Sequence, residues 1–441
     1  TDGRAARGTF SVSDPKQVLA WDKAHVWRPY TPMQEFLATG APLVIEGARG
    51  SRFIAADGRE YIDGNASWWC STLGHQHPRL VAALKAQAEA FCHVPLAGLA
   101  HEPAAALAAE LCQLAPAGLS KVFYSDDGST AIEVALKLAW QYWAQNGRPR
   151  RTRFLALEGA FHGDTLAAAS VSGIDVFRRP FGGVLVDCLR VPPGQRGHQQ
   201  AFEVLGQLLS QHEGELAAVI VEPLVQGAAG MRVYAPEYLR ALREATRRHD
   251  TFLICDEVFT GYGRTGPFWA SEHAGVAPDL LCTAKGFTGG MLPMAATLAS
   301  ARIFEGFLGS AERAFYYGHT FCGNPLGAAL AREVLRVYRD EKVLEGAAVR
   351  AARIAQAFER FAALPGVAAT RSLGMIGALD LEGPQGYLQT RGKMLCVRAL
   401  ERGVYLRPLG NTIYIAPSLN IPEPELEQLL DVIATCLPEI D

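Results

Sequence analysis

The sequence has no closely spaced cysteine pair, no long apolar run and no large excess of charge of either sign. Its 9 cysteines are scattered without a CxxC pair, which argues against a zinc ribbon or a disulfide framework and favours a reducing compartment. No segment approaches the roughly 20 apolar residues that cross a bilayer, and residues 1–7 lack the apolar core of a secretory signal. We therefore expect a cytoplasmic protein without a membrane segment.

The charge balance also excludes several partners. A net charge of −3 over 441 residues gives no general drive towards nucleic acid or anionic membranes. The nearest approach to a metal pattern, His75-x-His77, is followed by Pro78 and has no carboxylate beside it, so no metal is expected. A hydrophobic content of 49% with 20% charged residues is typical of a globular protein long enough for two or three domains.

What the sequence does contain is a lysine in an unusual setting. Lys285 lies between the apolar run 280–284 and the glycine-rich turn 286–290. A lysine in apolar surroundings loses its proton readily and can attack a carbonyl as a free amine. Upstream, Asp256 ends the apolar run 252–255, and an aspartate at the pyridine nitrogen of pyridoxal phosphate keeps that ring an electron sink. Lys285 and Asp256 together therefore indicate a Schiff-base site.

Short apolar runs alternate with amphipathic helices through the middle of the chain, for example the helix expected at 236–248. This alternation predicts an α/β protein whose mainly parallel sheet is covered on both faces. The runs that we predict as its strands include 121–125, 154–157, 217–221 and 251–255.

Functional groups collect at the carboxyl ends of such strands. The side chains expected at this edge are Asp126, Phe161, Glu222 and Asp256. Directly after the first strand, Gly128-Ser129-Thr130 opens a helix, where unpaired backbone N–H groups can bind phosphate. Serine and threonine are also ordinary helix caps, so this segment alone leaves both interpretations open.

The segment Gly261–Gly266 matches the GxGxxG pattern of dinucleotide-binding proteins. However, Pro267-Phe268-Trp269 follows where that pattern requires a helix, and no strand-end acid lies about 20 residues further on. A nicotinamide site is therefore not expected here.

The remaining segments suggest the domain organisation. Two prolines prevent a long helix over 21–33, so a packed loop is expected there. Trp68 and Trp69 point in different directions in an extended chain, and one of them is expected to line a pocket. Short strands and amphipathic helices after about residue 345 predict a smaller α+β domain. We predict an N-terminal segment 1–70 that packs with the small domain, a large domain 71–335 and a C-terminal small domain 336–441.

Three stretches carry a likeness to a known family: Phe161-His162-Gly163, Asp256-Glu257-Val258 and Lys285-Gly286. Together with the loop 261–266 they resemble the class III aminotransferases, pyridoxal-phosphate enzymes of fold type I. The resemblance extends from about residue 20 to the end of the chain. It implies a large domain with a seven-stranded, mainly parallel sheet, and a smaller domain formed by both terminal segments.

The resemblance also implies the role of each site residue. Lys285 would carry the cofactor as a Schiff base and shuttle the proton, and Asp256 would pair with the pyridine nitrogen. Thr320 would reach the phosphate of a neighbouring subunit, which implies a homodimer. The other cofactor-binding residues would be Gly128 and Ser129 at the phosphate, Phe161 and Val258 on the two faces of the ring, and His162 and Glu222 beside it.

Within the family, segments 25–31, 68–69, 225–231 and 406–410 are similar to the members that form 7,8-diaminopelargonate in biotin synthesis. This likeness implies that Arg407 binds the carboxylate of 7-keto-8-aminopelargonate through its guanidinium. Aromatic walls would hold the sulfonium of an S-adenosylmethionine donor by cation–π contact. The substrate-binding residues implied are Tyr30, Trp68, Trp69, Arg264, Gly318, Arg407 and Tyr414.

Three positions depart from this pattern. Phe161 stands where tyrosine is frequent, Asp127 where a small serine is usual, and His319 where proline is common in users of adenosylmethionine. A carboxylate at Asp127 is expected to be unfavourable beside phosphate. The His319 departure concerns the amino donor more than the acceptor.

The sequence therefore leaves several reactions open. The leading expectation is amino transfer to 7-keto-8-aminopelargonate by a ping-pong mechanism. The nearer alternatives are the same acceptor with lysine as donor, and a general ω-aminotransferase acting on β-alanine or diamines with pyruvate. A pyridoxal-phosphate aminomutase and a dinucleotide-dependent oxidoreductase are the remaining alternatives.

Overall fold

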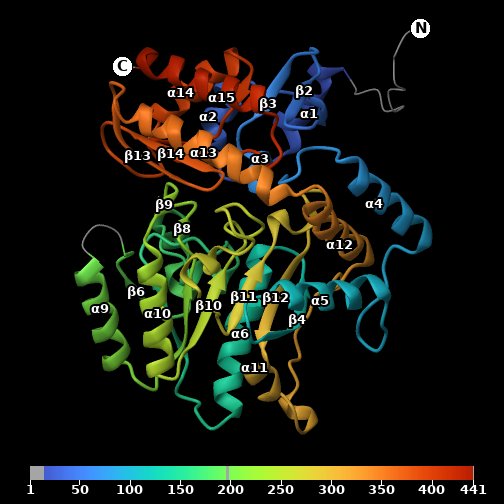
Figure 1. The fold of residues 1–441 in the computed structure, drawn as a ribbon, viewed down its shortest axis with the longest axis vertical. Coiled ribbons are helices and arrows are strands. Elements are labelled where there is room, and N and C mark those ends of the chain that lie inside the picture. The colour runs from blue at the N-terminus through green and yellow to red at the C-terminus, as the bar shows by residue number, and fades with distance from the viewer. Residues whose placement is uncertain (1–13, 195–197, 441) are drawn as a thin grey trace.

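A computed structural model describes residues 14–194 and 198–440 (Figure 1). Its central feature is a seven-stranded sheet with the order β4-β12-β11-β10-β7-β5-β6. Strand β12 runs antiparallel to both of its neighbours, and the other pairs are parallel. The strands are β4 (Leu119–Ser125), β5 (Arg153–Leu157), β6 (Cys188–Val191), β7 (Leu216–Val221), β10 (Phe252–Asp256), β11 (Leu280–Thr283) and β12 (Ala295–Ser300).

Both faces of this sheet are buried, as the apolar runs predicted. Along β10, Phe252 and Ile254 pack in the same cluster as helix α6 (Gly128–Gln145). The alternate residues of that strand, Leu253 and Cys255, pack in a second cluster with helices α9 and α10. Successive side chains of a strand point to opposite faces, so a continuous apolar run is needed here. The helices of this part are α4 (Pro78–Ala90), α5 (Glu102–Leu114), α6, α7 (Leu166–Val171), α8 (Asp175–Arg178), α9 (His198–Gln211), α10 (Pro236–Arg248), α11 (Ala301–Glu305) and α12 (Pro325–Asp340).

The two ends of the described chain lie together above the large sheet (Figure 1). Strand β15 near the C-terminus pairs in parallel with β3 near the N-terminus, which completes a four-stranded sheet, β1-β2-β3-β15. A three-stranded antiparallel sheet, β13-β14-β16, lies beside it. These strands are β1 (Ile45–Arg49), β2 (Arg52–Ala55), β3 (Glu60–Asp63), β13 (Val367–Leu373), β14 (Ile376–Leu381), β15 (Val404–Tyr405) and β16 (Thr412–Ile415).

This arrangement is the predicted α/β architecture of fold type I, with a large sheet and a smaller part built from both terminal segments. The domain boundaries at residues 70 and 335 remain predictions. The helices of the smaller part are α1 (Pro15–His25), α2 (Met33–Thr39), α3 (Ala66–Trp69), α13 (Val343–Phe361), α14 (Arg391–Glu401) and α15 (Glu423–Cys436). The large part also contains a short hairpin of β8 (Val225–Gln226) and β9 (Arg232–Val233).

One local prediction needs correction. The segment 21–33 was expected to be a loop, but its first five residues belong to α1, which ends at His25. The prolines prevent a helix only in the later part of the segment: residues 26–32 are not helical, and α2 begins after Pro32. The expectation for residues 1–13 lies outside the described part of the chain. No helix in the described ranges combines the length and hydropathy needed to span a bilayer.

Candidate active site

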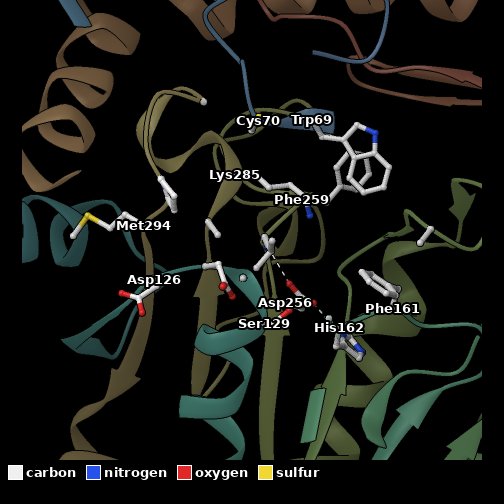
Figure 2. A pocket seen from close by; sticks show the side chains of 18 of the residues that line it. Trp69, Cys70, Asp126, Ser129, Phe161, His162, Asp256, Phe259, Lys285 and Met294 are labelled. Carbon is white, nitrogen blue, oxygen red and sulfur yellow. Dashed lines mark hydrogen bonds and ion pairs between the residues drawn. The ribbon is translucent and has the colours of Figure 1, made fainter. Parts of the chain in front are cut away.

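A pocket of about 410 Å³ opens at the carboxyl edge of the large sheet (Figure 2). The four strand-end residues that the sequence predicted at this edge all line it. The parallel register explains this convergence, because β10 pairs directly with β7 and β11 and brings their ends level. The predicted residues on its surface are Trp69, Asp126, Gly128, Ser129, Phe161, His162, Glu222, Asp256, Val258 and Lys285.

Lys285 begins the short 3-10 helix η3 (Lys285–Thr288) just after β11, in a left-handed backbone conformation with φ 49. Its Nζ lies 5.0 Å from the centroid of the Trp69 ring. Burial lowers the pKa of Lys285, and the carboxylates of Asp256 and Glu222 act in the opposite direction. The amine of this partly buried lysine is therefore biased towards the free base that attacks a carbonyl.

Asp256 lies on the opposite side of the pocket from Lys285 (Figure 2). Its Oδ2 is 2.7 Å from Nδ1 of the buried His162, and its Oδ1 accepts a hydrogen bond from the backbone N–H of Val258 at 3.1 Å. These two contacts fix the carboxylate in one orientation. A carboxylate held in this way, deep in a pocket, can pair with a protonated heterocyclic nitrogen.

The N-terminus of the 18-residue helix α6 forms one end of the pocket. Two glycines allow the chain to close around this end. A Cβ atom at Gly128 would lie 2.8 Å from a Val258 methyl, and one at Gly163, where φ is +120, would lie 2.2 Å from Ser129 Oγ. Backbone N–H groups at a helix start favour an anion such as phosphate.

Asp127, which was expected to be unfavourable beside phosphate, has a structural task. Its Oδ1 accepts a hydrogen bond from the backbone N–H of Thr130 at 2.9 Å, and the Thr130 hydroxyl accepts one from the Asp127 N–H. This reciprocal capping box begins α6. Aspartate and serine are both good N-caps, so the departure at this position preserves the cap.

The two tryptophans are the last two residues of an unusual turn, α3. Its four residues have φ angles of 44, 47, 67 and 76, a left-handed turn that costs about 1–2 kcal/mol per non-glycine residue. As predicted, the two side chains diverge. Trp69 is 5% exposed and lines the pocket against Phe259, whereas Trp68 is 40% exposed.

Asp63 holds this turn in place. Its Oδ2 accepts hydrogen bonds from the backbone N–H and the hydroxyl of Ser67 at 2.7 and 3.2 Å, and it also lies 3.0 Å from Nε2 of His75. Backbone strain of this kind persists only where surrounding contacts determine it.

We therefore expect Asp63→Ala to lower the free energy of unfolding by about 2–3 kcal/mol, because it leaves buried donors without acceptors. Chemical denaturation followed by tryptophan fluorescence would measure the change. Asp57→Ala removes an aspartate from an exposed turn and should change stability by less than about 0.5 kcal/mol. Equal stability of the two variants would contradict this account of the turn.

Arg407 meets Tyr30 and Trp68 next to the pocket, in what we call the arginine–aromatic cluster (Tyr30, Trp68, Phe177 and Arg407). The Arg407 guanidinium lies 3.4 Å from the Trp68 ring centroid and 5.8 Å from that of Tyr30. Tyr30 and Phe177 are in edge contact at 5.4 Å, and Phe177 in turn contacts Phe161. The cluster is thus continuous with the pocket lining.

Asp164 is a residue of this region that the sequence analysis did not single out. Its carboxylate accepts a hydrogen bond from the Tyr30 hydroxyl, and its backbone N–H donates to Ser129 Oγ at 3.3 Å. Burial, together with this carboxylate, raises the pKa of Tyr30. Because 134 residues separate Tyr30 from Asp164 along the chain, no sequence pattern could have paired them.

Besides Tyr30, Trp68 and Arg407, four predicted residues lie outside the pocket surface. Arg264 is fully buried and donates from Nη1 to the Pro417 carbonyl at 2.7 Å, and burial lowers its pKa to about 10. Tyr414 lies behind Trp69 and accepts a hydrogen bond from its indole nitrogen at 3.1 Å. Gly318 and Thr320 are exposed on this single chain. Their contact with substrate or cofactor therefore stays a prediction.

The lysine, the buried aspartate and the helix N-terminus fit pyridoxal phosphate: one end of the pocket suits its phosphate and the other its aldehyde. The glycine-rich loop 261–266 forms turns instead of starting a helix, so it does not have the structure of a dinucleotide fingerprint. The class defined by this fold and site is thus a fold-type-I pyridoxal-phosphate enzyme.

Comparison with known proteins narrows the class. Residues 37–437 match the family model for class-III aminotransferases. The protein therefore belongs to the class-III aminotransferases, which use pyridoxal phosphate.

Among its relatives are two adenosylmethionine-8-amino-7-oxononanoate aminotransferases. The chain is 42% identical to that of Synechococcus elongatus, over 94% of this chain and 99% of that protein. It is 40% identical to that of Nitratidesulfovibrio vulgaris, over 96% of this chain and 82% of that protein.

Two solved structures are also similar. The adenosylmethionine-8-amino-7-oxononanoate aminotransferase of Methanocaldococcus jannaschii matches with a TM-score of 0.94 and 34% identity, covering 97% of this chain and 99% of that one. The omega transaminase of Pseudomonas jessenii in complex with PMP matches with a TM-score of 0.90 and 28% identity, covering 97% and 98%.

Proposed function

We propose that the protein converts 7-keto-8-aminopelargonate to 7,8-diaminopelargonate in biotin synthesis, with S-adenosylmethionine as amino donor. The names of the relatives that match over nearly the whole chain support this reaction. The observation that carries it is the free guanidinium of Arg407. Stacking on Trp68 fixes its plane, and no ion pair to Arg407 is present within the described ranges. An oriented guanidinium at the end of an aromatic wall suits the carboxylate of a long keto acid.

Each side chain of the site has a separate role in this reaction. When bound, pyridoxal phosphate supplies an aldehyde that takes up the amine and a ring that withdraws electrons. Nζ of Lys285 takes the proton from the substrate carbon and returns it in the reverse half of the cycle. Asp256 keeps the ring nitrogen protonated, and Arg407 orients the keto acid by its carboxylate. Trp69 and Phe259 exclude water beside Lys285.

We also propose that the enzyme acts as a homodimer in which Thr320 and Gly318 complete the site of the second subunit. Both residues are exposed on the single chain, and their apolar neighbours Tyr316 and Phe321 are 80% and 57% exposed. Exposed large apolar side chains in one segment are typical of a protein–protein contact. The cytoplasmic location expected from the scattered cysteines remains a prediction.

Single-turnover absorbance of the holoenzyme tests the reaction and the donor together. We expect the cofactor band to bleach with S-adenosylmethionine and to recover with 7-keto-8-aminopelargonate. Bleaching with lysine alone would keep the acceptor and change the donor. Bleaching only with β-alanine or diamines, without recovery on the keto acid, would refute the proposed function.

Arg407→Ala should lower the second-order rate constant for the keto acid about 100-fold, because two charge-assisted hydrogen bonds are lost. The donor half-reaction should change much less. Stopped-flow absorbance measures each half-reaction separately. Arg402→Ala, which removes an arginine that directly follows α14 and pairs with Glu439, is the matched control and should leave both rates unchanged. An equal loss in both half-reactions would argue against the carboxylate contact.

A further inference from the structure

Glu222 is a buried carboxylate on the pocket surface, and the catalytic roles proposed above do not involve it. It follows β7, is 5% exposed and lines the pocket together with Lys285 and Trp69. Its Oε1 accepts the backbone N–H of Phe161 at 2.9 Å and its Oε2 that of Gly227 at 2.8 Å. Each carboxylate oxygen can accept a second hydrogen bond, so acceptor capacity remains on both.

No arginine or lysine forms an ion pair with Glu222 in the part of the chain that the structure describes. A buried carboxylate is costly unless a cation compensates it. Burial raises the pKa of Glu222 to about 7, and the carboxylate of Asp256 adds to the effect while His162 opposes it. A cationic ligand beside Glu222 would therefore stabilise the ionised form of its carboxylate.

Gly227 connects this carboxylate to two aromatic rings that line the same pocket. Gly227, which donates to Glu222, packs so closely on Phe259 that a Cβ there would lie 2.9 Å from its ring. Phe259 contacts Trp69 with ring centroids 4.4 Å apart, and the Lys285 amine lies over that same Trp69 ring at 5.0 Å. Aromatic faces with a nearby carboxylate are a suitable environment for an ammonium group.

We propose that Glu222, Trp69 and Phe259 form a subsite for the ammonium group adjacent to the reacting ketone of the acceptor. This inference rests on the proposed function and assigns the residues that contact the amino group of the acceptor. Nζ of Lys285 marks where the reacting carbon must come, and an amine one carbon away reaches the same aromatic face. Arg407 lies beside the pocket in the arginine–aromatic cluster, so the carboxylate and the ammonium group of the acceptor would contact separate residues.

The test compares two acceptors, 7-keto-8-aminopelargonate and 7-ketopelargonate, which lacks only the amino group. Reoxidation of the pyridoxamine form by each is followed by single-turnover absorbance. We expect the wild type to prefer the amino ketone by about 30-fold or more in kcat/KM. Glu222→Gln should reduce this ratio to below about threefold, because only the amino ketone loses a partner.

A matched control separates this role from a structural one. Glu158→Gln removes an exposed glutamate that follows β5 and should keep the wild-type ratio. If Glu222→Gln slows both acceptors equally and keeps the ratio, Glu222 only caps the two N–H groups and the inference is overturned. If the wild type accepts neither compound, the proposed function itself fails, and the subsite with it.

A second measurement does not depend on the folding of a variant. Binding of the two compounds to the borohydride-reduced wild-type holoenzyme, whose cofactor is held as a secondary amine and cannot exchange with the amine of the ligand, is followed by quenching of tryptophan fluorescence. The amino ketone should bind with a Kd about tenfold or more below that of 7-ketopelargonate. Equal dissociation constants would overturn the subsite.

Discussion

Replacing Lys285 with alanine should reduce kcat at least about 1,000-fold, because the variant loses both the amine that binds the cofactor and the group that moves the proton. Borohydride reduction should trap a covalent pyridoxyl group on the wild type and none on the variant, as mass spectrometry would show. Lys285→Arg should be equally inactive, since its guanidinium keeps its proton. Inactivity of Lys285→Arg would show that a positive charge at position 285 is not sufficient for catalysis.

Lys121→Ala is the matched control for this experiment. Lys121 is an exposed residue of β4 that lies over the Phe304 ring, and its loss should leave both activity and borohydride trapping unchanged. Retention of more than about a tenth of the activity in Lys285→Ala would contradict the assignment, since general acid–base groups contribute 100-fold or more.

Asp256→Asn should lower kcat by about 1,000-fold while leaving the protein folded. The amide fills the same volume but cannot stabilise a protonated ring nitrogen. Two opposite charges about 4 Å apart at an effective dielectric constant of 20 interact by about 4 kcal/mol, which corresponds to this factor. Steady-state kinetics and equilibrium titration with pyridoxal phosphate would separate the loss of turnover from any loss of cofactor affinity.

Asp279→Asn provides a comparison on the same sheet. Asp279 is buried just before β11, at the opposite edge from the pocket, where its carboxylate lies 2.6 Å from Arg243. This variant should lose stability and keep its turnover per bound cofactor. A similar loss of turnover in both variants would mean that Asp256 acts only by supporting the fold.

The strand-end residues show how much of the site local sequence could predict. The runs 217–221 and 251–255 were predicted as buried strands and lie in β7 and β10, and parallel pairing then required Glu222 and Asp256 to emerge at one edge. Gly128-Ser129-Thr130 likewise indicated the start of the helix that α6 forms, but left open whether this start binds phosphate or is only capped. These features depend on short-range periodicity and on one general rule of sheet geometry.

Other features depended on contacts that sequence spacing does not encode. The function of Asp127 as a helix cap became clear only from its hydrogen bonds with Thr130. Arg264, predicted as a substrate contact, is buried against Pro417, 153 residues away along the chain. Conformation and burial at such positions are decided by distant segments, so a pattern in one segment carries little information about them.

The sequence by itself determined the class of this protein. Asp256 at the end of one buried strand and Lys285 just after the neighbouring strand are local signals, and a parallel sheet brings them together. Only the tertiary structure decided which tryptophan lines the pocket. The left-handed turn that contains Trp68 and Trp69 and directs their side chains apart is stabilised by Asp63 and would be unfavourable in isolation. The tertiary structure likewise brought Glu222 into one pocket with Trp69 and Phe259, which are remote from it in sequence.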